Sequence, residues 1–384
     1  MNPRKELIRQ IQCTRNSKVV VYFTGDRQPP FASARIAEDA VRPLYDHLLT
    51  AGRSQNVDLF LFSRGGDVSV PWRIVSMFRE FCDALAFLVP YKAHSAATLM
   101  SLGADKIVMG RKAELGPIDP TLTRMTSGEA SGIPQEISVE DVNSYISFIR
   151  ERANINDQAA LAQVVSILAD NLTPLNLGSV NRQNSHIRLV ARKLLTSRRE
   201  KLDEAKLNSI VETLTEKMYS HGHAIGRREA QEIGLPVEMP DDAQETLLWN
   251  LYLEYEKALA LNEPLDPLVI LSSKDHVVLS DVPIAFIESE AKTHMFTTSV
   301  DLRKRRQVPT NPQISLNIGL SLPAGVKPEQ IPGQVQQVLQ QMVEQVSKDI
   351  PRMVQREIVR QSPEVGIDMR VYGGRWLEQQ EDKQ

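Results

Sequence analysis

Short apolar runs alternate with amphipathic stretches over the first third of the chain. The runs at residues 18–23, 57–62, 85–90 and 106–109 are continuous and rich in Val, Phe and Leu. Such runs are typical of strands that are buried on both faces. Between them, apolar side chains recur at helical spacing, most clearly at Ile74, Val75, Phe78 and Phe81. Strands that alternate with helices predict a mostly parallel α/β core.

The pattern changes twice further along the chain. From about Ser138 to Leu261 almost every segment has helical periodicity, and residues 262–268 have the composition of a linker. Strand patterns follow at residues 276–300 and 313–323, and a helical apolar stripe then runs to Ile350, where Pro351 is expected to interrupt it. These changes predict a first domain at residues 1–262 and a smaller α+β domain at residues 263–384, which we expect to control access, assembly or partner choice.

Composition and charge narrow the class of protein. The 384 residues are 42% hydrophobic and carry a formal net charge of −3, so a globular core is expected and a nucleic-acid coat is not. The basic run at residues 303–306 is short, as at a solvated strand end. The chain has only two cysteines, no leader-like apolar segment at its N-terminus and no run of 18 apolar residues. These features predict a cytoplasmic protein without a membrane span.

Candidate chemistry gathers at two strand ends. The run at 57–62 ends in Gly65 and Gly66, where backbone N–H groups can approach a ligand. The run at 85–90 turns into a helix that begins near Ser95. Backbone N–H groups of Gly66 and Ala96 that point at one spot would form an oxyanion hole for acyl transfer. The alternative is that Ser95 merely caps its helix, which is the usual role of serine at that position.

Several motifs favour the catalytic interpretation. The segments "SRGGD" at 63–67, "VPYKAHSAATLMSLGADKIVMG" at 89–110 and "ELGPIDPTL" at 114–122 occur in order, with a weaker match at 220–238. Through them, residues 15–260 resemble the serine dehydrogenase proteinase family, which is related to signal peptide peptidase A and the Clp protease proteolytic subunit. The resemblance implies a Clp/crotonase-like spiral α/β core with a helical segment. It also implies hydrolysis of a protein or peptide amide through an acyl-enzyme on Ser95, and a homo-oligomer. The oxyanion hole would come from Gly65, Gly66 and Ala96.

The general base departs from the family pattern. Where the Clp subunit has a histidine, this chain has Asp119 between prolines, and no lysine occurs between Ala113 and Arg192 to match the base of signal peptide peptidase A. The local candidates are Lys92 and His94. Lys92 is the tentative base of a Ser-Lys mechanism, or else a surface lysine. His94 adjoins Ser95, so its side chain is expected to point away and to shape the pocket.

More distant groups and rival functions stay open. His186, Lys193, Lys217 and His221 could return to the site through the fold. No spacing typical of a metal site or a phosphate loop occurs, so we expect no metal and no cofactor. The missing family base and the extra domain support a catalytically silent scaffold of the same fold that binds a partner protein. A third and weaker hypothesis is an acyl-CoA enzyme of the crotonase type.

Overall fold

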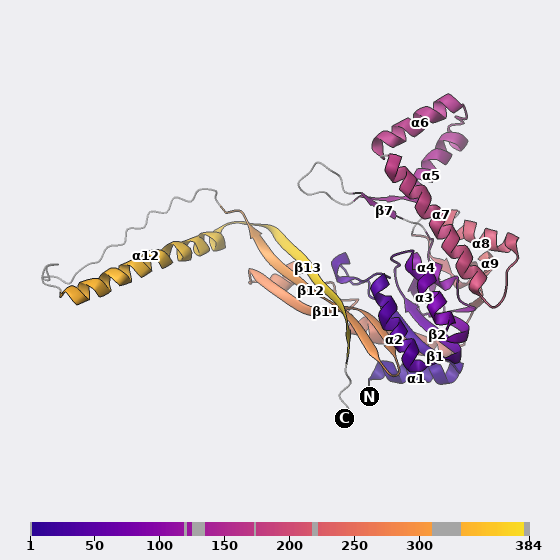
Figure 1. The fold of residues 1–384 in the computed structure, drawn as a ribbon, viewed down its shortest axis with the longest axis horizontal. Coiled ribbons are helices and arrows are strands. Elements are labelled where there is room, and N and C mark those ends of the chain that lie inside the picture. Colours follow the sequence, from indigo (N-terminus) through magenta and orange to yellow (C-terminus); the bar gives the residue numbers. More distant parts are fainter. Residues whose placement is uncertain are drawn as a thin grey trace. The chain divides into compact units, whose positions relative to one another are not determined.

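The structure is a computed structural model of the 384-residue chain, and it describes residues 2–118, 121–124, 135–172, 174–216, 222–308 and 332–379. The chain forms two compact units. The first unit contains residues 1–265, 281–298 and 373–384, and the second contains residues 266–280 and 299–372. Figure 1 shows the course of the chain with its elements labelled.

The described strands are mostly short within the first 240 residues and long near the C-terminus. They are β1 (Lys18–Thr24), β2 (Ser54–Phe62), β3 (Cys82–Val89), β4 (Lys92–Ala93), β5 (Lys106–Met109), β6 (Glu114–Leu115), β7 (Thr121–Arg124), β8 (Gln135–Ser138), β9 (Ile225–Gly226), β10 (Val237–Glu238), β11 (His276–Ser289), β12 (Thr293–Arg306) and β13 (Glu364–Glu378).

The described helices alternate with the first strands and then follow one another. They are α1 (Pro3–Arg15), η1 (Pro30–Ala32), η2 (Glu38–Ala40), α2 (Val41–Ala51), α3 (Val70–Arg79), α4 (Ala96–Ser101), α5 (Val139–Ser147), η3 (Phe148–Arg152), α6 (Gln158–Asn171), α7 (Pro174–Ser197), α8 (Glu204–Glu216), α9 (Arg227–Ile233), α10 (Asp242–Ala258), α11 (Pro267–Leu271) and α12 (Gly333–Gln361).

The main sheet confirms the predicted α/β core. Among the described residues it has eight strands in the order β10-β5-β3-β2-β1-β11-β12-β13. Strands β10, β5, β3, β2 and β1 pair in parallel, whereas β11 pairs with β1 antiparallel. The last six positions of β2 are all buried; five of them are apolar, and the sixth, Asp58, is ion-paired with Arg15. A smaller sheet, β4-β6-β9, lies at the end of this core.

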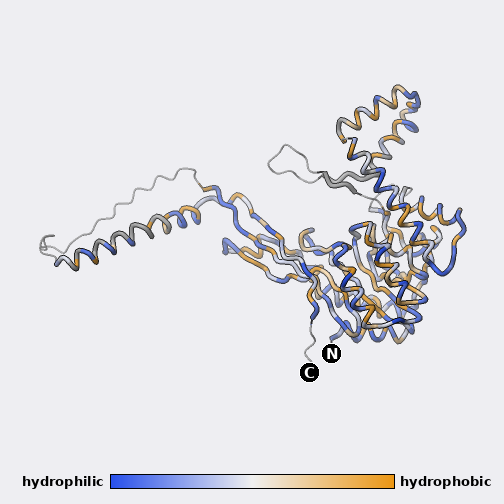
Figure 2. Tube along the Cα trace, in the orientation of Figure 1, coloured by the Kyte–Doolittle hydropathy of each residue, from blue (hydrophilic) through white to orange (hydrophobic). Residues whose placement is uncertain are grey.

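Each face of the parallel strands has its own helical layer. On one face, α1 and α10 pack against alternate strand residues such as Val21, Phe60 and Leu88. On the other face, α2, α3, α4, α7 and α8 pack against the intervening residues, such as Val20 and Leu59. Figure 2 shows the apolar segments of this core in orange. Because neighbouring residues of a strand point to opposite faces, one apolar strand serves both layers.

The second unit contains the predicted long helix. The helix α12 continues through Pro351 to Gln361, so the predicted interruption at Pro351 is wrong. Proline removes one backbone hydrogen bond but keeps a helical φ, and a long helix can continue on both sides of it. Ion pairs of Arg306 with Asp275 (2.7 Å) and Glu364 (3.1 Å) connect the segments of this unit.

Two sequence predictions are not tested by this architecture. The boundary between residues 262 and 263 stays a prediction, although later residues 281–298 and 373–384 belong to the first compact unit. The predicted strand at 313–323 lies outside the described residues.

Within the described ranges, no helix combines the length and the apolar character that crossing a bilayer requires.

Candidate active site

The first wall of the site is the segment that follows β2. Ser63 forms a parallel bridge with Ala93 of β4, with Ser63 N–H donating to the Lys92 carbonyl at 2.9 Å. On its other side, Gly66 forms a parallel bridge with Ile36. The buried Ser63 hydroxyl accepts hydrogen bonds from the Thr24 hydroxyl (2.7 Å) and the Gly65 N–H (3.0 Å). The segment with the two glycines is therefore fixed by the bridges to Ala93 and Ile36 and by the Ser63 hydroxyl.

Both glycines occupy conformations and spaces that exclude a side chain. Gly65 has a φ of 104°, and a Cβ there would lie 2.7 Å from the Ser95 Cβ. Gly66 has a φ of 155°, and a Cβ there would lie 2.2 Å from the Ile36 carbonyl oxygen. Gly65 thus brings the backbone against Ser95 and Gly66 brings it against Ile36, which a residue with a side chain would not allow.

Ser95 stands in a strained backbone conformation between β4 and α4. Its φ of 51° and ψ of −115° are unusual for a residue with a side chain, and such conformations cost of the order of 1–3 kcal/mol. Ser95 occupies the N-cap position of α4, but its side chain makes no capping hydrogen bond. The simple capping interpretation therefore does not account for the conformation of Ser95.

Two backbone donors beside Ser95 are uncommitted. Ile36 N–H donates to the Gly65 carbonyl and Asp67 N–H donates to the Ile36 carbonyl, which leaves the Gly66 N–H out of this bridge. At the start of α4, Ala97 N–H donates to the His94 carbonyl at 2.9 Å. Within the described ranges, neither the Gly66 N–H nor the Ala96 N–H has an acceptor. An oxyanion hole is built from N–H groups of this kind, which have no other acceptor.

The ammonium of Lys92 contacts Asp26 and Tyr91. It lies 3.1 Å from the Asp26 carboxylate and 4.6 Å from the centre of the Tyr91 ring. The side chains of Lys92 and Asp26 are 23% and 15% exposed, so this ion pair is largely shielded from water. The ammonium of Lys92 is therefore bound to a carboxylate and not to the Ser95 hydroxyl.

His94 packs on the opposite side of β4 from the glycine turn. Its ring lies against Gly116, and its Nε2 is 3.1 Å from the Glu114 carboxylate. Burial lowers the pKa of His94, while the Glu114 carboxylate raises it and the Lys92 and Arg64 charges lower it. Ser95 instead contacts Gly65. The side chains of His94 and Ser95 thus contact different segments, Gly116 and Gly65. Among the described residues, no side chain is hydrogen-bonded to the Ser95 hydroxyl.

Sequence reasoning missed the partners of these groups. Asp26 directly follows β1, and Glu114 opens the "ELGPIDPTL" motif, but only the fold shows which cation each carboxylate meets. It also missed the buried Thr98, which donates to the Ala93 carbonyl (2.6 Å) and accepts from the Gly116 N–H (3.0 Å). Thr98 thereby connects α4 to β4 and to the residue that follows β6.

The remaining predicted candidates are elsewhere or outside the described residues. Lys193 lies on α7 with its ammonium 5.6 Å from the Trp72 ring centre, and His186 is on the same helix. Asp119, Lys217 and His221 lie outside the described residues. No group of His, Cys, Asp and Glu side chains in the described ranges is arranged to hold a metal ion.

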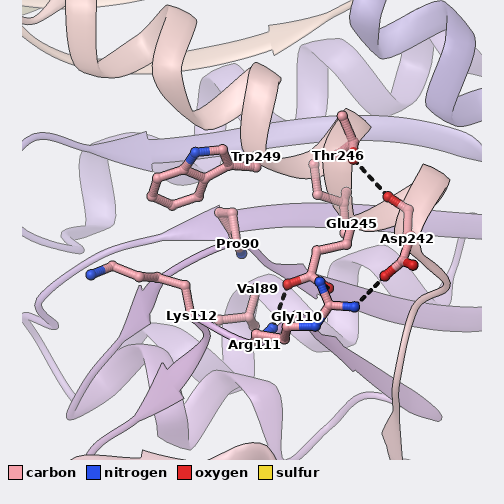
Figure 3. A pocket seen from close by; sticks show the side chains of 10 residues that line it. Val89, Pro90, Gly110, Arg111, Lys112, Asp242, Glu245, Thr246 and Trp249 are labelled. Carbon is pink, nitrogen blue, oxygen red and sulfur yellow. Dashed lines mark hydrogen bonds and ion pairs between the residues drawn. The ribbon is translucent and has the colours of Figure 1, made fainter.

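A separate pocket lies at the carboxyl ends of β3 and β5. It has a volume of about 420 Å³ and is walled by Pro90, Lys112 and Trp249 on one side (Figure 3). On the other side, Arg111 is ion-paired with Asp242 and Glu245. The pocket abuts α10, whereas α4 packs on the opposite face of the sheet. We therefore do not assign it to the chemistry of Ser95.

Comparisons with known proteins show to which family the chain belongs. The chain is 24% identical over 257 residues to an uncharacterized protein of Methanocaldococcus jannaschii, covering 65% of this chain and 78% of that protein. A second uncharacterized protein of that organism is 25% identical over 123 residues, covering 31% and 42%. A mutant of the 1510-N membrane-bound stomatin-specific protease has 16% identity and a TM-score of 0.31, covering 55% of this chain and 78% of that chain. Residues 1–265 match the family described as ClpP-like SDH-type serine proteinase. The chain belongs to this ClpP-like family of serine proteinases.

Proposed function

We propose that this chain is an active serine peptidase in which Ser95 attacks an amide carbonyl of a protein or peptide. The observation that carries the proposal is the strained Ser95, whose side chain makes no capping hydrogen bond and rests against Gly65. A residue held in a costly conformation beside uncommitted N–H donors is typical of an activated nucleophile. Family membership supports the same reaction class.

The steps follow from the groups around Ser95. The Ser95 hydroxyl oxygen forms a bond to the carbonyl carbon, and its proton passes to a nearby base. The Gly66 and Ala96 N–H groups donate to the oxyanion that develops. When the amide bond breaks, the base returns the proton to the departing amine. Water then attacks the acyl-enzyme in the same way and releases the acid.

We propose Lys92, three residues before Ser95, as the base that accepts the proton of the Ser95 hydroxyl. Its ammonium is 3.1 Å from the Asp26 carboxylate, so the proposal requires this ion pair to open when substrate binds or subunits assemble. The proposed proton transfer thus begins only after the Lys92 side chain has left Asp26, in a site that is largely shielded from water. His94 is assigned a positioning role, because its ring packs on Gly116 and is held by Glu114.

Hydrolysis of a fluorogenic unfolded protein such as labelled casein tests the proposal. Wild-type chain should release fluorescence, and Ser95→Ala should not. Ser101→Ala is a matched control, because Ser101 lies at the end of the same helix and its buried hydroxyl is bound to the Ala97 carbonyl at 2.8 Å. If Ser95→Ala cleaves as fast as wild type, Ser95 is not the nucleophile.

One observation favours a second candidate, a catalytically silent scaffold that binds a partner protein. Within the described ranges, Lys92 is bound to Asp26 and His94 to Glu114, and neither is hydrogen-bonded to Ser95. A scaffold predicts no labelling of Ser95 by a fluorophosphonate probe, whereas the peptidase predicts labelling. The probe therefore separates the two functions.

The location and partners of the protein belong to the same proposal. We place the protein in the cytoplasm as a homo-oligomer without nucleic acid, with a partner protein recruited through the region after residue 262. Cys13 is exposed and Cys82 is buried, and both are free, as suits a reducing compartment. Cell fractionation of the full chain tests the location: recovery with the membrane fraction after a salt wash would contradict it.

A further inference from the structure

The strand β13 forms one edge of the main sheet. It is the last strand in the order of the described sheet and pairs there with β12. All residues from Asp368 to Arg375 are exposed, and Met369 and Val371 are 44% and 41% exposed. A long exposed edge with apolar side chains presents unpaired N–H and carbonyl groups, and such an edge readily pairs with another strand.

The centre of β13 is complementary to itself. When two copies run antiparallel with Met369 opposite Met369, Asp368 of each copy faces Arg370 of the other. In the same register, Ile367 faces Val371 on the other face of the pair. Opposite charges and branched apolar residues directly across a strand pair are stabilising. Because each contact occurs twice, the arrangement is that of a twofold dimer.

The charges of β13 also select this register. Asp368 contacts Arg305 only loosely, at 3.6 Å with both side chains 60% exposed, and such surface pairs contribute little. Arg370 lies over the Tyr372 ring at 5.7 Å and has no carboxylate partner within the described ranges. By contrast, Glu364 is already bound by Lys304 and Arg306, each at 3.1 Å.

Other antiparallel registers pair charges that are already in use. A register shifted toward the N-terminus would place Arg370 opposite Glu364, which leaves Asp368 facing Gly366. A register shifted toward the C-terminus would place Asp368 opposite Arg375, whose guanidinium lies 3.3 Å from Asp281. The Met369-centred register is thus the one that pairs Arg370, which has no carboxylate partner within the described ranges, with the loosely held Asp368.

We infer that β13 is the docking edge for β13 of a second copy of this chain, joined antiparallel about Met369. This surface is separate from the Ser95 site and does not depend on the proposed function. One strand pair buries less than the roughly 1,600 Å² of a standard interface, so we expect a dimer that depends on concentration.

Charge reversal with remixing tests the inference on the full chain. In Asp368→Arg, arginines face arginines across the register, and in Arg370→Asp, aspartates face aspartates. Sedimentation velocity at roughly 10–100 micromolar should show that each variant alone has a lower mass than the wild-type species. An equal mixture of the two variants should recover the wild-type mass, because each new charge then meets its opposite. The double variant should recover it as well.

Circular dichroism of each variant checks that the fold is intact, and the remixing step guards against a trivial loss of structure. A wild-type chain whose mass is that of a monomer throughout the concentration range overturns the inference, since another segment or a peptide would then cover the edge. Single variants that associate like wild type overturn it too. So does a mixture that stays dissociated.

Discussion

At the scale of single residues, Ser95 and its glycine neighbours define the site. Ser95 holds a positive φ without a capping bond, and Gly65 fits against it only because it lacks a Cβ. The two nearby cations differ in their partners, since Lys92 meets Asp26 and His94 meets Glu114. The residues that we propose as nucleophile and oxyanion donors thus lie close together, while the proposed base is ion-paired with Asp26.

Substitution of Lys92 tests its role as the base. Lys92→Met should reduce cleavage of labelled casein by about 10²–10⁴-fold, the usual effect of losing a positioned base. Lys92→Arg is the matched control, because it keeps the positive charge beside Asp26 but cannot accept a proton at neutral pH. If Lys92→Arg retains wild-type activity, Lys92 serves as a charge and the base is another group.

Substitution of Gly65 tests the close approach to Ser95. In Gly65→Ala the new methyl group would lie 2.7 Å from the Ser95 Cβ and 3.2 Å from its Oγ. We expect activity to fall by roughly 10²–10³-fold, as when an oxyanion donor is lost. Gly52→Ala is the control for backbone strain without steric crowding, because Gly52 has a φ of 68° but no atom lies within 4 Å of an added Cβ. Equal activity losses in both variants would show that contact with Ser95 is irrelevant.

At the scale of elements, the sequence predicts the parallel strands of the main sheet better than the strands near the C-terminus that extend it. Apolar-rich runs such as residues 57–62, in which only Asp58 is charged, indicate parallel strands, because such strands are buried on both faces. The pairing of β11 with β1 was not predictable, since it joins residues far apart in the chain. The strand β13 was missed, although Val365, Ile367, Met369 and Val371 alternate with other residues. Most residues on both faces of this strand are exposed, so the alternation does not mark a face that packs on a core.

The same reasoning explains what could be predicted of the site. Gly65, Gly66 and Ser95 stand at the ends of apolar runs, where local sequence signals a turn. The partner Asp26 lies in the segment after β1 and Glu114 begins β6, so their pairing with Lys92 and His94 depends on the tertiary fold.

A buried histidine pair joins the β11–β12 hairpin to α2. His47 is fully buried, with Nδ1 2.8 Å from the Ser289 hydroxyl and Nε2 3.0 Å from His294 Nδ1. Burial is the main cause that lowers the pKa of His47 to about 3, and the charges of Lys292 and Lys5 add to it. Burial also lowers the pKa of His294. Both rings are therefore neutral in the folded chain near neutral pH.

This pair predicts a loss of stability in acid. The unfolded chain binds protons at these histidines near pH 6.5 and the folded chain does not, so their stabilising effect is complete above that pH and declines below it. Between about pH 7.5 and about pH 5.5, His47 alone should lower the free energy of unfolding by about 1.4 kcal/mol.

Urea unfolding of His47→Leu at several pH values checks this expectation. The variant should be less stable at neutral pH and should lose part of the dependence on pH. His223→Ala is the control, because His223 is exposed and paired with Glu229. A slope with pH that is unchanged in His47→Leu would contradict the assignment.

At the scale of the whole molecule, assembly is the main expectation. The helix α12 exposes Val335, Val338 and Met342 by 47%, 54% and 62%, and apolar and polar stretches alternate along it in Figure 2. Such a stripe on a long helix suits packing against another helix. We therefore propose that α12 supports assembly in addition to the α/β core.

A charge in this stripe should weaken that assembly. In Met342→Glu, light scattering of the full chain should give a lower mass than wild type at equal concentration, because the introduced carboxylate opposes apolar packing. Gln345→Glu, an exposed position on the same helix, should leave the mass unchanged. If wild type itself has a mass near 43.1 kDa at all concentrations, the chain is a monomer and the assembly proposal fails.

Covalent labelling of Ser95 tests the central claim most directly. Full chain is treated with a fluorophosphonate, digested, and searched by mass spectrometry for the peptide that carries Ser95. The account predicts one phosphonyl adduct on Ser95, formed as the hydroxyl oxygen displaces fluoride, and none in Ser95→Ala. Labelling should also be lost in Lys92→Met and persist in Ser101→Ala. An unlabelled Ser95 in the folded wild-type chain, under conditions that label a known serine peptidase, would contradict the account.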